Sequence, residues 1–150
     1  MKILLASDAS KHSEVAARTI NAEFRAQGTE VLVVQVVEPA GYGVPPQMAQ
    51  GYAPELQDQL KQASESVERI AETLRKAGFK AESRVLENEI RTAILDAAQD
   101  WNADMIVLGS HGEKGLRKFL MGSVADSVAH HAQCSVLIVR RPEDQRTMPA

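Results

Sequence analysis

The chain has 150 residues, of which 44% are hydrophobic and 25% charged, a composition typical of a globular domain with its own core. Its formal net charge of -3 gives no indication of a nucleic-acid-binding protein, which normally presents a basic face. Cys134 is the single cysteine, so an intrachain disulfide is excluded, and no apolar run approaches the ~20 residues of a membrane span. We therefore expect a cytoplasmic protein without a membrane partner.

Five segments are predicted to be β-strands. In chain order they are residues 3–6, 31–37, 80–86, 105–108 and 135–139. All but 80–86 are continuous apolar runs, a pattern typical of parallel strands that are covered on both faces. Residues 80–86 alternate between apolar and polar side chains and form the weakest candidate.

Apolar residues at helical spacing lie between these strands. They are Ala16, Ile20 and Phe24; Leu56, Leu60, Ala63, Val67, Ile70 and Leu74; Ala93, Ile94, Ala97, Ala98 and Trp101; and Val124, Ala125, Val128 and Ala129. The alternation predicts an α/β fold: a single doubly wound domain over residues 1–142, in which a five-stranded parallel sheet carries helices on both faces. A flexible tail at 143–150 is expected to follow, and the long irregular segment 38–53 is interpreted as a lid or binding loop.

Two segments that follow predicted strands contain the residues expected to bind a ligand. In open α/β sheets, ligands bind beyond the carboxyl ends of the strands, which here places residues 6–10 and 109–112 at the expected site. Glycines let backbone N–H groups approach an anion, and Gly122-Ser123 then opens a helix whose N-terminus favours negative charge. This pattern fits a di- or triphosphate. The sequence lacks both G-x-x-x-x-G-K-[ST] and a G-x-G-x-x-G after the first strand, which disfavours a P-loop NTPase and a dinucleotide oxidoreductase.

Gly109, Gly112 and Gly122-Ser123 follow the spacing G-x2-G-x9-G-[ST]. Together with Asp8 after the first strand and the closing run 134–140, this spacing resembles the universal stress protein family, in particular its ATP-binding members. The resemblance extends from Met1 to about Pro142. It implies strand order 3-2-1-4-5, a homodimer, and ATP as cofactor, with Mg²⁺ held mainly through the phosphates and no protein side chains assigned as metal ligands.

The resemblance also implies which residues contact the adenine nucleotide. They are Ala6, Ser7, Asp8, Val36, Leu108, Gly109, Ser110, His111, Gly112, Arg117, Gly122, Ser123 and Val124. Asp8 would lie beside the adenine and ribose, and Val36 would contact the adenine through its backbone. Leu108 and Gly109 would line the ribose and the phosphate entrance. Gly112 and the residues from Gly122 to Val124 would hold the phosphates.

Several of these positions also have a purely structural interpretation. Asp8 or Ser10 can cap the first helix, and Ser123 can cap the last, with Asp126 completing a capping box. Arg117 can screen a triphosphate or simply be solvated. His111, which has no evident nucleophile beside it, is interpreted as a loop residue rather than a catalytic base.

One segment departs from the family pattern. Many members carry Gly-x-Pro before the third helix, whereas this chain has Glu87-Asn88-Glu89-Ile90. Asn88 tolerates a left-handed conformation better than most residues, so the turn is expected to persist.

The leading functional hypothesis is an ATP-binding regulatory or stress-response module with slow or no hydrolysis. Asp8 is the only carboxylate expected near the pocket, whereas phosphoryl transfer needs several charged groups in place. The alternatives are a nucleotide-dependent adenylyl or phosphoryl transferase of a related fold, and an interaction module with a vestigial site. If the last strand, Ser135–Val139, lies at an edge of the sheet, its apolar run favours pairing with a second copy of the chain.

Overall fold

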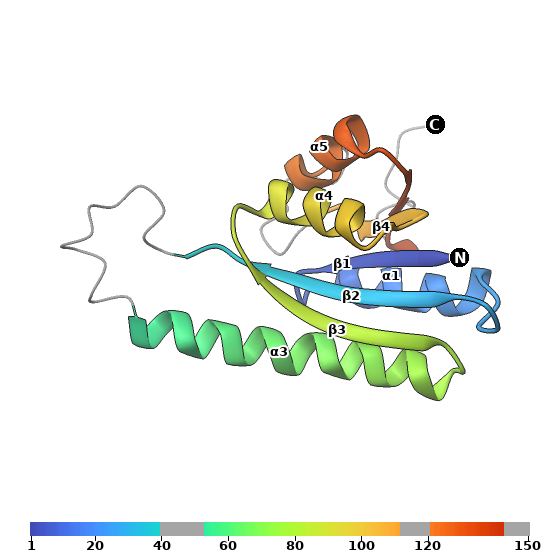
Figure 1. Cartoon of the computed structure of the whole chain (residues 1–150), viewed down its shortest axis with the longest axis horizontal. Helices are drawn as coiled ribbons and strands as arrows, with labels where there is room; N and C mark the ends of the chain where they lie inside the picture. The colour runs from blue at the N-terminus through green and yellow to red at the C-terminus, as the bar shows by residue number, and fades with distance from the viewer. Residues whose placement is uncertain (40–52, 112–120, 143–150) are drawn as a thin grey trace.

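The computed structural model describes residues 1–39, 53–111 and 121–142 (Figure 1). Its elements follow the order β1 (Lys2–Ser7), α1 (Lys11–Glu23), β2 (Glu30–Val37), α3 (Ala53–Lys76), β3 (Lys80–Glu87), α4 (Ile90–Asp100), β4 (Met105–Gly109), α5 (Ser123–His131) and β5 (Ser135–Val139). The five strands form one parallel sheet in the order β3-β2-β1-β4-β5. This architecture confirms the predicted fold class and strand order.

Helices cover both faces of the sheet, and alternate residues of the central strands supply two separate cores. Ile3 and Leu5 of β1 pack with α1 and α3, whereas Leu4 packs with α4 and α5. Figure 1 shows α4 and α5 together on one side of the sheet and α3 on the other. The continuous apolar runs in the sequence therefore reflect burial on both faces.

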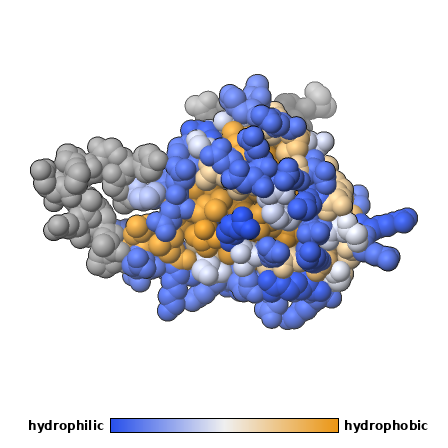
Figure 2. Space-filling view, in the orientation of Figure 1, coloured by the Kyte–Doolittle hydropathy of each residue, from blue (hydrophilic) through white to orange (hydrophobic). Residues whose placement is uncertain are grey.

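The strand β3 alternates because one of its faces is covered along the strand, whereas the other is covered only near its carboxyl end. Ala81 and Val85 pack in the core beside α3, whereas Glu82 and Arg84 on the opposite face are exposed. In the same orientation, Figure 2 shows apolar surface over the carboxyl-terminal halves of β2 and β3, beside the start of α4. Val36, Leu86 and Ile90 are among the partly buried apolar residues packed against the other core, the one formed with α4 and α5.

The long helix α3 ends in a turn at Gly78. Gly78 has φ +98°, a left-handed conformation that glycine adopts without steric cost. The N–H of Phe79 then donates to the carbonyl of Leu74 at 3.0 Å, which is the hydrogen bond of a Schellman motif. This turn directs the chain straight into β3.

None of the described helices is both long and apolar enough to cross a membrane. Segment 38–53, interpreted above as a lid or binding loop, lies outside the described residues except for its two ends, and so does the tail at 143–150.

Candidate functional site

The carboxyl ends of β1 and β4 lie side by side at the centre of the sheet. Ala6 pairs with Leu108, so the residues that follow each strand leave the sheet next to one another. From β1 the chain continues to β2 and β3 on one side of β1. It then crosses over to β4, which lies on the other side of β1. This reversal of direction is where open α/β sheets form a crevice for ligands.

Asp8 is fixed by hydrogen bonds within the turn between β1 and α1. Its Oδ1 accepts from the backbone N–H of Ser10 at 3.0 Å and from the hydroxyl of Ser13 at 2.7 Å. The backbone N–H of Asp8 in turn donates to Ser13 Oγ at 2.9 Å. Ser10, not Asp8, is the N-cap of α1, since its side chain accepts from the N–H of Ser13. Asp8 therefore stands before the helix, at the end of β1.

Ala9, between Asp8 and the cap, adopts a strained backbone conformation. Its φ of +64° lies in the left-handed region, which costs a residue with a Cβ roughly 1–2 kcal/mol. The N–H of Ala9 donates to Oγ of the buried Ser7 at 3.2 Å. Strain of this kind is often found at binding sites, where surrounding contacts maintain it. No signal in the sequence predicted it.

Ser110 joins three elements at the end of β4. It is fully buried, its N–H donates to the carbonyl of Val139 in β5 at 2.9 Å, and its carbonyl accepts from the N–H of Gly122 at 2.7 Å. These bonds hold the start of α5 against the end of β4. The sequence placed Ser110 in the site through the family resemblance but did not reveal this role.

Glycines at two positions here permit close packing. A Cβ on Gly122 would lie 3.0 Å from the carbonyl oxygen of Ser110 and 3.3 Å from Cα of His111. A Cβ on Gly109 would lie 2.6 Å from Cβ of His12 in α1, closer than real Cβ contacts. The glycines of the motif therefore let α1 and α5 approach the end of β4, in addition to any contact with an anion.

Among the described residues, no side chain caps the N-terminus of α5. Gly122 is the N-cap residue, so the predicted cap at Ser123 and its capping box with Asp126 are wrong. Ser123 is the first residue of the helix and is exposed. Asp126 donates its N–H to the carbonyl of Gly122 at 2.9 Å, and its Oδ1 lies 3.5 Å from Nδ1 of His130. The first N–H groups of a helix have no acceptor within the helix, and together with the dipole they favour an anion. This end of α5 is suited to a phosphate group.

His111 is more buried than a loop position suggests. The residue is 8% exposed, its Nδ1 lies 3.0 Å from Ser110 Oγ, and the centroid of its ring is 5.6 Å from that of His12. Among the described residues, Nε2 of His111 is buried without a hydrogen-bond partner. An unpaired buried polar group costs about 1–3 kcal/mol, so a polar ligand atom or a water reaching Nε2 would be stabilising.

The turn before α4 is built differently from the expectation for Asn88. Asn88 is not left-handed; its Oδ1 instead accepts from the N–H of Glu89 at 2.8 Å. Glu89 is the N-cap of α4 and accepts from the N–H groups of Arg91 and Thr92. Hydrogen bonds from the backbone and hydroxyl of Thr92 hold the pKa of the Glu89 carboxyl below its ordinary value. Val36, at the end of β2, is half-buried near this turn on the same face of the sheet.

The structure thus brings together most of the predicted positions. Those near the ends of β1 and β4 and the start of α5 are Ala6, Ser7, Asp8, Leu108, Gly109, Ser110, His111, Gly122, Ser123 and Val124. Gly112 and Arg117 lie outside the described residues. Within the described part of the chain, no group of three or more His, Cys, Asp or Glu side chains is placed to hold a metal ion.

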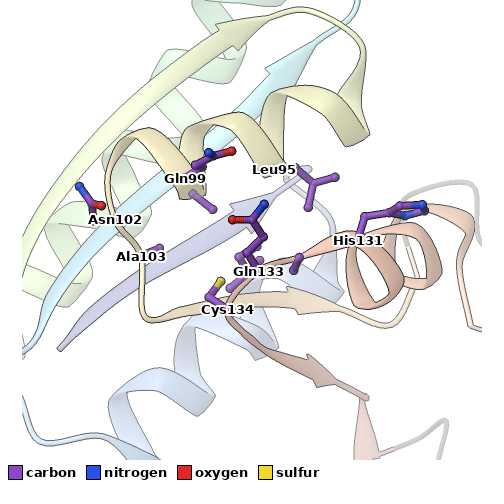
Figure 3. A pocket seen from close by; sticks show the side chains of 10 residues that line it. Leu95, Gln99, Asn102, Ala103, His131, Gln133 and Cys134 are labelled. Carbon is purple, nitrogen blue, oxygen red and sulfur yellow. The ribbon is translucent and has the colours of Figure 1, made fainter.

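A separate pocket of about 210 Å³ lies at the opposite end of the sheet, between the carboxyl ends of α4 and α5 (Figure 3). Its lining includes Leu95, Gln99, His131, Gln133 and Cys134. Burial raises the pKa of the Cys134 thiol, which lowers its reactivity. This pocket does not belong to the site at the carboxyl ends of the strands.

A family model described as the universal stress protein family matches residues 1–140. The chain belongs to this family. Among its relatives, it is 36% identical over 140 residues to a universal stress protein of Thermus aquaticus, covering 92% of this chain and 97% of that protein. It is 33% identical over 149 residues to the universal stress protein MJ0531 of Methanocaldococcus jannaschii, covering 96% and 84%. A match of 41% identity over 85 residues to the universal stress protein Sll1388 of Synechocystis covers 57% of this chain and 55% of that protein.

Solved structures of universal stress proteins share the fold. The structure of protein MJ0577 from Methanocaldococcus jannaschii superposes with a TM-score of 0.82 at 29% identity, covering 93% of this chain and 95% of that one. A universal stress protein from Archaeoglobus fulgidus in complex with dAMP superposes with a TM-score of 0.58 at 29% identity, covering 92% and 96%.

Proposed function

We propose that this universal stress protein binds ATP at the carboxyl ends of β1 and β4 and works as a nucleotide-dependent regulatory module of the stress response. The observation that carries the proposal is the N-terminus of α5. No side chain in the described part of the protein caps this end, and the N–H of Gly122 holds it against the carbonyl of Ser110. A phosphate group there would accept hydrogen bonds from free backbone N–H groups and interact favourably with the helix dipole.

The phosphate end of the nucleotide would lie against Gly122, Ser123 and Val124. Gly109 and Leu108 would border the ribose, with Asp8 beside it and the backbone of Val36 beside the base. Gly112 and Arg117 are proposed to contribute from the segment outside the described residues. The dAMP complex of the Archaeoglobus fulgidus protein, at 29% identity, supports an adenine nucleotide as the class of ligand.

We expect hydrolysis to be slow or absent. Phosphoryl transfer needs a positioned base or water and charged groups that stabilise the transferred phosphoryl. Asp8 is the proposed carboxylate of the pocket, and its Oδ1 is already bound by Ser10 and Ser13. Mg²⁺ would therefore be held mainly through the phosphates of the nucleotide. The thiol of Cys134 fits the reducing cytoplasm in which we place the protein.

We further propose that the protein forms a homodimer by pairing β5 with its copy. The strand pairs with β4 and lies at the end of the sheet order, so one side of its backbone is at an edge. An apolar edge strand such as Ser135–Val139 favours pairing, and a two-fold arrangement closes the assembly.

The choice of nucleotide is tested by calorimetry on protein purified free of nucleotide. ATP, AMP and GTP are titrated separately in the presence of Mg²⁺. The proposal expects ATP to bind with micromolar affinity and GTP to bind more weakly. Equal binding of ATP and GTP would contradict an adenine site, and no binding of any nucleotide would contradict nucleotide binding altogether.

A further inference from the structure

Ser13 is a buried hydroxyl that contacts Asp8 twice. It is 3% exposed and lies in the first turn of α1, three residues after the N-cap Ser10. Its hydroxyl donates to Asp8 Oδ1 at 2.7 Å and accepts from the backbone N–H of Asp8 at 2.9 Å. One small side chain therefore binds both the backbone and the carboxylate of the same residue.

This double contact restricts the orientation of the carboxylate. The N–H of Ser10 converges on the same Oδ1 at 3.0 Å, so one oxygen of Asp8 is held by two donors. With Oδ1 fixed, the rotation of the carboxylate plane is fixed too, and so is the position of Oδ2. Hydrogen bonds to a charged group are among the stronger ones in proteins, which makes this restraint effective.

Removing the hydroxyl would release the carboxylate without removing it. Of the two donors described above, Oδ1 would keep the Ser10 N–H and lose the Ser13 hydroxyl, and the backbone N–H of Asp8 would lose its Ser13 acceptor. The side chain of Asp8 could then rotate among several rotamers, and binding a ligand would cost the entropy of fixing one of them.

We propose that Ser13 is a positioning residue for the sugar of the bound nucleotide. It holds the carboxylate of Asp8 in the orientation that accepts hydrogen bonds from the ribose hydroxyls. The inference rests on the proposed function. It adds that ribose recognition depends on Ser13, a residue that does not itself contact the nucleotide.

The chemistry of the ligand makes this role measurable. A carboxylate binds a sugar through its hydroxyl groups, so a nucleotide without them cannot benefit from a well-oriented Asp8. The preference of the protein for ATP over 2′,3′-dideoxy-ATP therefore reports on the orientation of this carboxylate. A purely structural role for Ser13 would change the affinity for both ligands to the same extent.

The experiment measures the affinity of both nucleotides for the full chain and for Ser13→Ala and Ser13→Thr. We expect Ser13→Ala to lower the affinity for ATP about ten-fold, the effect of losing one hydrogen bond to a charged group. The affinity for dideoxy-ATP should stay unchanged. Ser13→Thr keeps the hydroxyl and is expected to restore the preference. In an Asp8→Ala background, Ser13→Ala should cost nothing further, because the two residues act as one unit.

Ser66→Ala is the matched control, since Ser66 is also a buried serine (6% exposed) but lies in α3 outside the site. It should leave both affinities unchanged. If Ser13→Ala does not fold, Ser13→Cys is used in its place, because the thiol has a similar size and is a weaker hydrogen-bond donor. The affinities for ATP and dideoxy-ATP are then compared in the same way. Equal weakening of ATP and dideoxy-ATP, or no effect on ATP, would overturn the role of Ser13 while nucleotide binding stands. No binding of ATP by the unmodified protein would overturn the proposed function and this inference together.

Discussion

The carboxylate of Glu38, just after β2, accepts a hydrogen bond of 2.9 Å from the backbone N–H of Ile90, the first residue of α4. Fifty-two positions separate the two residues in the chain. A proline at position 90 would carry no N–H. In this chain the N–H is present, and Glu38 provides its acceptor. The bond also ties the end of β2, where Val36 would meet the base, to the turn before α4.

Glu38→Ala should therefore destabilise the protein by about 1 kcal/mol, the usual contribution of one hydrogen bond. Proline is tolerated in the first turn of a helix, so Ile90→Pro should be compatible with the fold. In the Ile90→Pro background, Glu38→Ala is expected to cost almost nothing, because no donor remains. Urea unfolding of the four proteins gives the coupling free energy. Additive effects of the two substitutions would show that the hydrogen bond contributes nothing to stability.

The left-handed Ala9 leads to a prediction of increased stability. Ala9→Gly should raise the free energy of unfolding by about 0.5–1 kcal/mol, because the relief of backbone strain exceeds the extra entropy of glycine in the unfolded chain. Asn102, with φ +55°, is the matched control. Asparagine tolerates this conformation, so Asn102→Gly should have little effect. Thermal unfolding measures the stability of both variants. If Ala9→Gly were less stable than the unmodified protein, Ala9 would not be strained.

Glu68 on the surface of α3 is expected to titrate unusually low. A hydrogen bond from Arg75, followed by one from Ser83, lowers the pKa of its carboxyl from 4.5 to about 2. Because the folded pKa is below the unfolded one, its contribution to stability is complete above pH 4.5 and is lost as the pH falls towards 2. The pair is exposed and screened by salt, so the contribution to stability is small.

This prediction is checked by following the Glu68 carboxyl by NMR from neutral to acidic pH at low salt. Arg75→Gln should move the midpoint up towards the ordinary value. A midpoint near 4.5 in the unmodified protein would show that the hydrogen bond of 2.7 Å between Arg75 and Glu68 does not persist in solution.

The directions of the backbone groups in β5 show which substitution should disrupt the proposed dimer. The carbonyl of Val139 accepts from Ser110 after β4, so residues 135, 137 and 139 direct their backbone groups towards β4. Val136 and Ile138 direct theirs to the free edge, since the direction alternates along a strand. Ile138→Pro should therefore remove an edge donor and give monomers by light scattering, while the control Ile138→Val stays dimeric. A dimeric Ile138→Pro protein would contradict pairing through β5.

Much of the fold was predictable because its causes are local. The strands β1, β2, β4 and β5 are continuous apolar runs since both faces of the sheet are covered around them. The alternation of β3 also indicated a strand, and its exposed Glu82 and Arg84 explain why that signal was weaker. The strand order came from the family resemblance.

The details of the site were less predictable because they depend on contacts between distant segments. Gly122 instead of Ser123 caps α5, because the N–H of Gly122 is held by Ser110. The contact between Gly109 and His12 joins β4 to α1, and nothing near either residue in the sequence indicates it. The double contact of Ser13 with Asp8 requires a turn through a left-handed alanine, which residue preferences argue against.

Calorimetric titration of ATP into the nucleotide-free protein, and into its Gly122→Glu and Ala129→Glu variants, tests the phosphate site at the start of α5. Gly122→Glu would place a negative charge where the phosphates are proposed to lie. Ala129→Glu adds the same charge near the other end of α5, at an exposed position. We predict micromolar binding of ATP that is lost in Gly122→Glu and kept in Ala129→Glu. Binding that survives in Gly122→Glu, or its absence from the unmodified protein, would contradict a phosphate site at the start of α5.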